Sequence, residues 1–531
     1  MMPAISSRMM SSYEMDSYPL LQEDDFEEDM IIFRRNPPAS SESDYRYRQL
    51  RNIQDDSEKE EDGEEEKIAI PRHLGLAGCV WYIIGQVIGT GIFITPSGVL
   101  RGTGSSVGWA LVIWVLCGII QFCGALVYAE LSLIMHKSGG DFTFLLQAWG
   151  PVIGFCRLWV STIINPSSLA IQSLVIAKYL LTPFFQCVEE PLLAVRLISI
   201  CCILFLVFIN CISVKFSTKL TGFLTLTKTF GLFVIFISGI YNLANGHTEY
   251  LANGFSSGRL DVTLLPMGFF SGLYSFSGWE IITTITEEIH KPARNIPLSL
   301  FISMTAITAV YLMANIAYFT LLSPAQMLSS GAVAADYSVL ALGSWSWLVW
   351  IFVAMSACGS ANASILARSR TTFAAAREGL FPEIFSMVSI KHRTPLPSVV
   401  ILLIALIYLV EDDVIVLIEY TQFVDIMFIL LTCFILPYYR WKYPHIPRPF
   451  KIPLFVVVIY TSAMIFILGM SLYSDPVGKG IGICIVLTGL PIYFAFVHPR
   501  YRMKCLGPFS LKLTRVLQRL FFCIHQEKET F

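Results

Sequence analysis

Apolar segments of membrane-spanning length dominate this chain between Arg72 and about His498. A helix needs roughly 20 apolar residues to cross the hydrocarbon core of a bilayer. Only helices and closed barrels satisfy their backbone groups in lipid, so the pattern predicts an all-α membrane protein with about 12 helices. The ninth segment is short, and the third can be read as two pieces. We expect spans near residues 75–98, 106–133, 153–181, 191–212, 219–241, 262–284, 297–321, 344–371, 397–410, 414–437, 452–473 and 478–497.

Composition supports this fold class. The chain is 55% hydrophobic and 14% charged, whereas a soluble domain carries roughly a quarter charged residues. We expect three parts: a disordered acidic cytosolic tail at 1–70, a twelve-helix domain at 71–500 and a cytosolic tail at 501–531. No signal peptide is recognised at the start, so the first apolar segment is expected to serve as the insertion signal. The sequence has no basic, aromatic-rich face, which argues against nucleic-acid binding.

The short loops carry their positive charges unequally. If the N-terminus is inside, most Lys and Arg residues fall at cytosolic junctions, among them Arg368, Arg440 and Arg448. The outer loops then hold few, among them Lys479. Cytosolic loops of membrane proteins are enriched in Lys and Arg, so both termini of this multi-pass protein are predicted to be cytosolic.

Two of the spans are interrupted by small and polar residues. Residues 85–93 of the first span contain three glycines, and residues 271–280 of the sixth mix glycine, serine and aromatic residues. Glycine is a poor helix former, and a broken helix in lipid leaves backbone groups that a ligand can satisfy. Close helix packing through small residues is the alternative explanation. A matched pair of breaks, in corresponding halves of a five-plus-five inverted repeat, favours a transporter site.

Several motifs in order along residues 70–500 carry a family resemblance. They include Gly89-Thr90-Gly91-Ile92-Phe93, Ala129-Glu130-Leu131, Arg294-Asn295-Ile296-Pro297-Leu298 and Arg448-Pro449-Phe450-Lys451. The chain resembles the light-chain subunits of heteromeric amino acid transporters (L-type and y+L-type), in the amino acid-polyamine-organocation superfamily. The resemblance implies a LeuT-like fold with broken first and sixth helices, and amino acid exchange by antiport across the plasma membrane.

The resemblance also implies a substrate site at the two breaks. The substrate carboxylate would meet backbone N–H groups near Thr90 and Gly91, and its amino group would meet carbonyls near Val87, Tyr274 and Ser277. Helix ends suit these charges, because N-terminal ends attract anions and C-terminal ends attract cations. Tyr274 is expected to act as a gate, with plain packing as the alternative. The predicted substrate-binding set is Val87, Gly89, Thr90, Gly91, Tyr274, Ser275, Ser277, Glu280 and Asp425.

Two further residues take their roles from the resemblance. Lys228, in the fifth span, matches an intramembrane lysine whose ammonium would replace a sodium ion and brace the first helix against the eighth. A lysine snorkelling to the interface is the alternative. Cys187, in an outer loop, matches the cysteine that forms a disulfide with a single-span glycoprotein heavy chain. An outside cysteine with no partner in its own chain itself suggests intermolecular pairing.

Two acidic residues in the predicted sixth and tenth spans bear on the side-chain preference. Acidic groups at Glu280 and Asp425 would stabilise a cationic side chain, so we expect exchange of cationic with neutral L-amino acids. Both carboxylates hydrogen-bonding to neighbouring helices is the competing explanation. A neutral-only exchanger, a cystine or acidic amino acid exchanger and a non-transporting sensor stay open. We expect no enzyme activity, cofactor or metal site, and the terminal Glu529-Thr530-Phe531 suggests a PDZ-domain partner.

Overall fold

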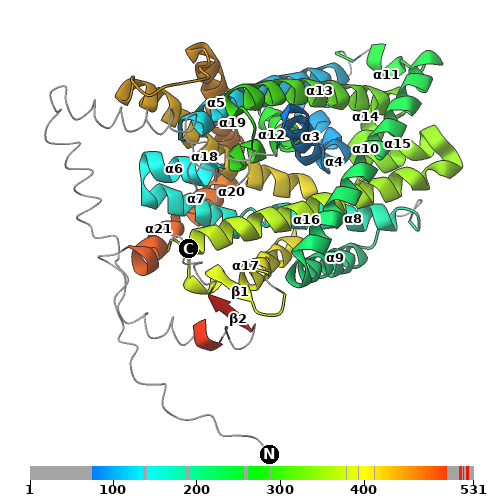
Figure 1. Cartoon of the computed structure of the whole chain (residues 1–531). Helices are drawn as coiled ribbons and strands as arrows, with labels where there is room; N and C mark the ends of the chain where they lie inside the picture. The colour runs from blue at the N-terminus through cyan, green and yellow to red at the C-terminus, as the bar shows by residue number, and fades with distance from the viewer. Residues whose placement is uncertain are drawn as a thin grey trace, which may run out of the picture. The chain divides into compact units, whose positions relative to one another are not determined.

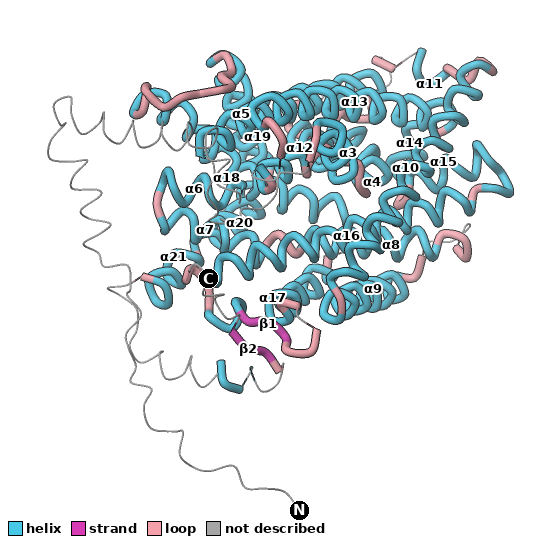
Figure 2. Tube along the Cα trace, viewed as in Figure 1, coloured by secondary structure: helices cyan, strands magenta, loops and turns pink. Residues whose placement is uncertain are grey.

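A computed structural model of the chain describes residues 74–135, 140–185, 190–252, 254–255, 261–286, 289–377, 379–392, 394–411, 413–498, 514–516, 518 and 522–525. The chain divides after Ala69 into two units, and the first lies wholly outside these residues. Cys187 and the terminal residues 529–531 also lie outside them, as does most of the predicted C-terminal tail. The described part is almost entirely helical (Figures 1 and 2).

Seven long apolar helices run without interruption. A rise of about 1.5 Å per residue makes each of them long enough to cross a bilayer. Their order along the chain follows the predicted spans, with ends that shift by a few residues. They are α5 (Val107–Met135), α9 (Leu192–Ile212), α10 (Val214–Ala244), α13 (Pro292–Leu321), α16 (Trp347–Arg377), α18 (Val414–Lys442) and α19 (Leu454–Ser474).

Other predicted spans are interrupted helices. The first consists of α3 (Leu76–Val87) and α4 (Gly91–Gly102), whose axes differ by 56°. The third, which the sequence allowed as two pieces, is α7 (Pro151–Ile163) and α8 (Ser167–Leu181). The sixth is α12 (Leu265–Ser275) followed by the 3-10 helix η2 (Trp279–Thr284). The predicted breaks in the first and sixth spans are therefore present in the structure.

The last spans and the connections are shorter elements. The ninth predicted span is α17 (Leu396–Val400) with η6 (Ile401–Val410), and the twelfth is α20 (Pro476–Leu487), α21 (Gly489–Ile492) and the π-helix η7 (Tyr493–Val497). Among the described residues, nine helices pass as spans by length and apolarity, or ten with α3 and α4 as one. The connecting elements are α6 (Gly140–Trp149), α11 (Glu249–Ala252), α14 (Pro324–Ser329), α15 (Val333–Leu342), η4 (Gly343–Trp345) and η5 (Glu383–Ser386).

The outer faces of the helices are apolar. Phe205 and Phe208 on α9, Phe233 on α10 and Ile459 on α19 are each more than half exposed. Contiguous exposed apolar surface of this kind is rare on soluble monomers and is stable against lipid tails. Together with the long apolar helices, these side chains make the chain a multi-pass membrane protein.

A buried ionic cluster ties α5 to α18 and to the segment before α19. We call Glu130, Arg440, Arg448 and Ile452 the Glu130 cluster. Glu130 is fully buried, and its carboxylate accepts two hydrogen bonds from the Arg440 guanidinium, at 3.1 and 2.5 Å. The Ile452 N–H donates to it at 2.8 Å, and Arg448 lies 3.9 Å away. A buried carboxylate with this many partners is electrostatically compensated, so the cluster fixes the relative positions of these segments.

Helix packing brings the interrupted spans together. Element α12 packs against α4, α3 packs against α13, and α16 packs against both α8 and α10. In Figure 1, α3, α4 and α12 lie between α13 and α16. The breaks in the first and sixth spans therefore face each other inside the bundle of membrane-spanning helices.

Candidate functional site

The two broken helices touch at their glycines. A Cβ atom on Gly91 would lie 2.6 Å from the Ser275 Cα atom, and one on Gly278 would lie 3.3 Å from the Gln86 carbonyl oxygen. Gly278 also has φ +112°, a conformation that residues with a side chain rarely adopt. These two glycines let the backbones of the first and sixth spans approach each other directly, so the breaks form one site.

Several backbone N–H and carbonyl groups at this site are available to a ligand. No hydrogen bond in the described part of the chain uses the N–H groups of Gly89, Thr90 and Gly91, which precede or begin α4. On the opposite side, the Tyr311 hydroxyl lies 3.0 Å from the Val87 carbonyl oxygen and 2.9 Å from that of Ser275. Each carbonyl oxygen has two lone pairs, so the Val87 carbonyl retains capacity for a ligand.

Side chains stabilise the break of the sixth span. The hydroxyls of Ser275 and Thr95 are 2.6 Å apart. Ser277 donates to the Leu273 carbonyl at 3.0 Å and accepts from Gln422 at 3.2 Å. Glu280 accepts the Gly278 N–H at 2.9 Å. These bonds hold the irregular backbone in place without closing off the N–H groups of the first span.

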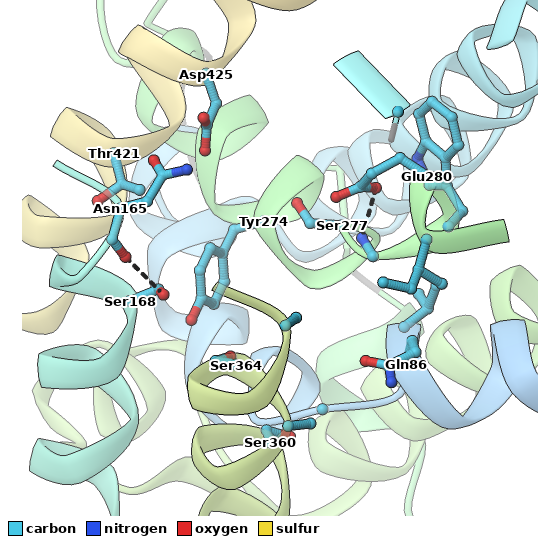
Figure 3. Close-up of a pocket in the computed structure, with 18 of the residues that line it drawn as sticks. Gln86, Asn165, Ser168, Tyr274, Ser277, Glu280, Ser360, Ser364, Thr421 and Asp425 are labelled. Atoms are coloured by element: carbon cyan, nitrogen blue, oxygen red, sulfur yellow. Dashed lines mark hydrogen bonds between the residues drawn. The ribbon is translucent and has the colours of Figure 1, made fainter. Parts of the chain in front are cut away.

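A cavity of about 360 Å³ lies beside the breaks. All nine predicted substrate-binding residues line it, and so does Lys228. Figure 3 shows the Tyr274 ring between two polar groups of side chains, with Asn165, Ser168, Thr421 and Asp425 on one side and Gln86, Ser277 and Glu280 on the other. A volume of this size is at the lower end for small-molecule sites. No group of three metal-ligating side chains occurs within the residues that the structure describes.

The sequence did not single out Arg157, which lines this cavity. Its guanidinium on α7 lies 2.7 Å from Asp425 on α18 and 3.1 Å from Asp141 on α6. We call these three residues the Arg157 triad. Asp425 therefore has a cationic partner within the protein, which is the competing explanation stated from the sequence. The same signal that marked Lys228, a charge inside an apolar segment, also marks Arg157.

Comparison with known proteins decides the family. A model of the amino acid permease family matches residues 74–496. The chain belongs to this family. The cystine/glutamate transporter of Homo sapiens is 40% identical over 465 residues, which cover 87% of this chain and 93% of that protein. The large neutral amino acids transporter small subunit 2 of Homo sapiens is 38% identical over 467 residues, 87% of each chain. The Asc-type amino acid transporter 1 of Mus musculus is 37% identical over 468 residues, 87% of this chain and 88% of that protein.

These similarities confirm the family resemblance that the motifs predicted, and they make the chain an amino acid transporter. The family match spans both broken helices and every residue that lines the cavity. The site just described is therefore the permease's candidate substrate site.

Lys228 contacts the first broken span. Its ammonium donates to the Gly85 carbonyl near the end of α3, and the residue is 5% exposed. This contact agrees with the predicted brace on the first helix. Among the described residues, no hydrogen bond joins Lys228 to α16, so the structure supplies only half of the predicted brace.

Two basic residues lie elsewhere than the loop assignment predicted. Arg368, expected at a cytosolic junction, belongs to α16 and lines the cavity, where it donates to the Ser168 hydroxyl at 2.9 Å. Lys479, expected in an outer loop, belongs to α20, is 2% exposed and pairs with Glu419 at 3.1 Å. Segment hydropathy could not show this, because a single charge barely changes the average of a long apolar helix.

The permease cavity is closed at the α4 side. Residues 91–100 are all buried, and the Tyr179 hydroxyl on α8 donates to the Phe93 carbonyl at 3.1 Å. In the other direction the lining continues past Gly85 to Asp141 and Phe142 at the start of α6. The structure thus closes the site on one side of the breaks and extends it on the other.

Proposed function

We propose that this permease exchanges L-α-amino acids across the plasma membrane. The observation that supports it is the set of unused N–H groups at Gly89, Thr90 and Gly91, on the wall of a cavity at the N-terminal end of α4. A helix N-terminus carries partial positive charge and binds carboxylates. The ends of α3 and α12, with carbonyls near Val87, Tyr274 and Ser277, suit the ammonium group. Every α-amino acid carries both groups.

Lys228 supplies a fixed positive charge where the first helix breaks. We propose that its ammonium takes the place of a coupling ion and holds α3 in position. Transport would then depend on an amino acid bound on each side of the membrane in turn, which is exchange. The predicted cytosolic termini place the open side of the cavity, toward α6, at the cytosol.

A heavy-chain partner belongs to the same proposal. One relative carries the words "small subunit" in its name, which implies a second subunit for that protein. Cys187 falls in a predicted outer loop of this permease, and we propose that it forms the disulfide with a single-span glycoprotein heavy chain. Replacing Cys187 with serine should abolish the high-mass band on non-reducing gels while reducing gels stay unchanged. Persistence of that band would exclude Cys187 as the linking residue.

The relatives' names cover acidic, cystine and neutral substrates, so family membership does not choose a side chain. The expected preference for cationic and neutral substrates depended on Glu280 and Asp425. Arg157 already compensates Asp425, and Glu280 has a hydrogen bond from the Gly278 backbone. The cationic preference stays a prediction, with weaker support from Asp425 than the sequence suggested.

Counterflow in proteoliposomes tests the exchange directly. The full chain, with and without a co-expressed heavy chain, is reconstituted and loaded with an unlabelled amino acid mixture. Labelled amino acids should enter rapidly only when the lumen contains substrate. Binding without counterflow would mean a sensor, and equal entry into empty vesicles would mean a channel or uniporter.

A further inference from the structure

We propose that Arg368 is a specificity-determining residue of this permease, and that it binds a carboxylate on the side chain of the substrate. The substrate class would then be amino acids whose side chain ends in a carboxylate, in place of the cationic class that the sequence suggested. The inference rests on the proposed function, because it assumes that the cavity beside the breaks holds an amino acid.

The described part of the protein satisfies few of the hydrogen-bond donors of Arg368. A guanidinium has five N–H donors. Arg368 donates one of them to the Ser168 hydroxyl, at 2.9 Å. Its Nε atom is buried and has no hydrogen-bond partner among the described residues. In the same part of the chain, no carboxylate oxygen lies within ion-pair distance of it. A charged group inside a membrane-spanning helix is costly and normally paired, so a free one indicates a ligand.

Arg368 on α16 lines the same cavity as the backbone clamp at Gly89, Thr90 and Gly91. Ser360, Ser364 and Arg368 line the cavity at intervals of four residues, so they share one face of the helix. Ser360 marks the level of the clamp, since a Cβ on Gly89 would lie 3.2 Å from its hydroxyl. The Cα atom of Arg368 is about 12 Å further along the helix. Helical side chains lean toward the helix N-terminus, so the Arg368 side chain is expected to extend from its Cα atom toward the level of the clamp.

Tyr274 lies along the same path. Its side chain lines the cavity together with Thr90 and Arg368, and Figure 3 shows its hydroxyl directed toward Ser364 and Ser168. A substrate whose α-carboxylate is held by the clamp would extend its side chain past this ring. A carboxylate at the end of that side chain fits the planar fork of an arginine better than any neutral group does.

No other charged group that the structure describes around the cavity competes with Arg368 for a substrate carboxylate. Asp141 and Asp425 both pair with Arg157, and Lys228 is bound to the first broken span. Glu280 accepts a backbone hydrogen bond but has no cation within ion-pair distance among the described residues. The wall therefore presents one unpaired cation and one unpaired carboxylate.

Two kinds of substrate share the proposed chemistry. Glutamate and aspartate offer a single carboxylate to Arg368. Cystine offers a carboxylate and an ammonium at its far end, and the ammonium would meet Glu280. The test therefore uses labelled glutamate and cystine, with leucine and arginine as neutral and cationic probes.

The experiment is counterflow by the full chain, with the heavy chain, carrying Arg368→Gln or Arg368→Lys. The matched control is Arg101→Gln, because Arg101 lies outside the cavity in a half-exposed pair with Asp413 at 3.5 Å. Wild type should exchange glutamate or cystine. Arg368→Gln should lower that exchange at least about tenfold and leave leucine within about twofold, because it removes a charge-assisted bond. Arg368→Lys should restore part of the exchange, and Arg101→Gln should match wild type.

Different failures are distinguishable. Leucine or arginine exchange without glutamate or cystine exchange in wild type would overturn this inference and leave the proposed function intact. Absence of counterflow with every probe would overturn the proposed function itself. An equal loss of all substrates in Arg368→Gln, together with a lower melting temperature, would make Arg368 a structural residue.

Discussion

The Glu130 cluster and the cavity wall around Arg368 both place charged side chains inside membrane-spanning helices. Glu130 is saturated, with two hydrogen bonds from Arg440 and one from the Ile452 backbone. Arg368 has one bond, to Ser168, and a buried Nε atom without a partner. A charge that the protein fully compensates holds segments together, whereas an under-compensated one at a cavity is available to a ligand. The contrast predicts which substitutions change stability and which change transport.

The largest effect, on stability, is expected in the Glu130 cluster. Glu130→Gln removes the charge that compensates Arg440, and breaking a buried pair in this way costs about 3–5 kcal/mol. The melting temperature in detergent and the folded yield should fall sharply. The matched control is Asp413→Asn, whose half-exposed pair with Arg101 is worth less than about 1 kcal/mol. A stable Glu130→Gln variant with altered substrate preference would show that Glu130 acts in transport and does not hold the helices together.

The next largest effect is expected where the broken helices touch. Gly91→Ala puts a Cβ 2.6 Å from the Ser275 Cα atom, so the two backbones must separate. A displacement of about 1 Å at a reacting or binding group can cost roughly 100-fold, and we expect counterflow to fall by about that factor. Gly469→Ala on α19 is the control, since nothing lies within 4 Å of its added methyl group. Normal counterflow by Gly91→Ala would exclude a site built on backbone contact.

A smaller effect on transport, with no loss of stability, is expected at Lys228. Lys228→Met keeps the length of the side chain and removes a buried ammonium whose recorded hydrogen bond is to Gly85. Hydrogen bonds to charged groups contribute about 1.5–3 kcal/mol, so counterflow should drop about tenfold or more. The melting temperature should hold or rise, because an apolar residue of similar size is cheaper to bury. If the melting temperature fell together with counterflow, Lys228 would be a residue that stabilises the fold.

The smallest effect is expected at Asp425. Asp425→Asn removes one of the two carboxylates that face Arg157, and Asp141 remains as its partner. Because Arg157 already neutralises Asp425, the ratio of arginine to leucine uptake should stay within about twofold of wild type. A clear fall in that ratio would show that Asp425 meets a cationic side chain, as the sequence suggested.

The sequence predicted the features that depend on local composition. Apolar length placed the spans, and glycine content located the breaks at 85–93 and 271–280, because both signals are contained within one segment. The Lys228 contact with the first span and the gathering of the predicted site residues followed from the family resemblance. The five-plus-five repeat and the role of Cys187 stay predictions.

What the sequence could not give are pairs between helices. The partner of Asp425 lies 268 residues away, on α7, and no spacing rule connects the two. The sequence placed Arg368 at a cytosolic junction because Lys and Arg residues concentrate on that side of the membrane. Its place in the cavity depends on the rotation of α16, which packing against α8 and α10 decides. Such rotations are tertiary properties, and local patterns do not encode them.

The last described strand of the chain gives the permease a late step in its biosynthesis. Strand β1 (Met387–Ser389) pairs antiparallel with β2 (Cys523–His525), and Met387 and Cys523 are both buried. Burial also raises the pKa of the Cys523 thiol to about 11, so it stays neutral at this contact. The ribosome makes β2 after every described membrane span, and β1 therefore stays unpaired until all of these spans have been made. A chain that stops before β2 leaves β1 without its partner strand and uncovers the buried side of Met387.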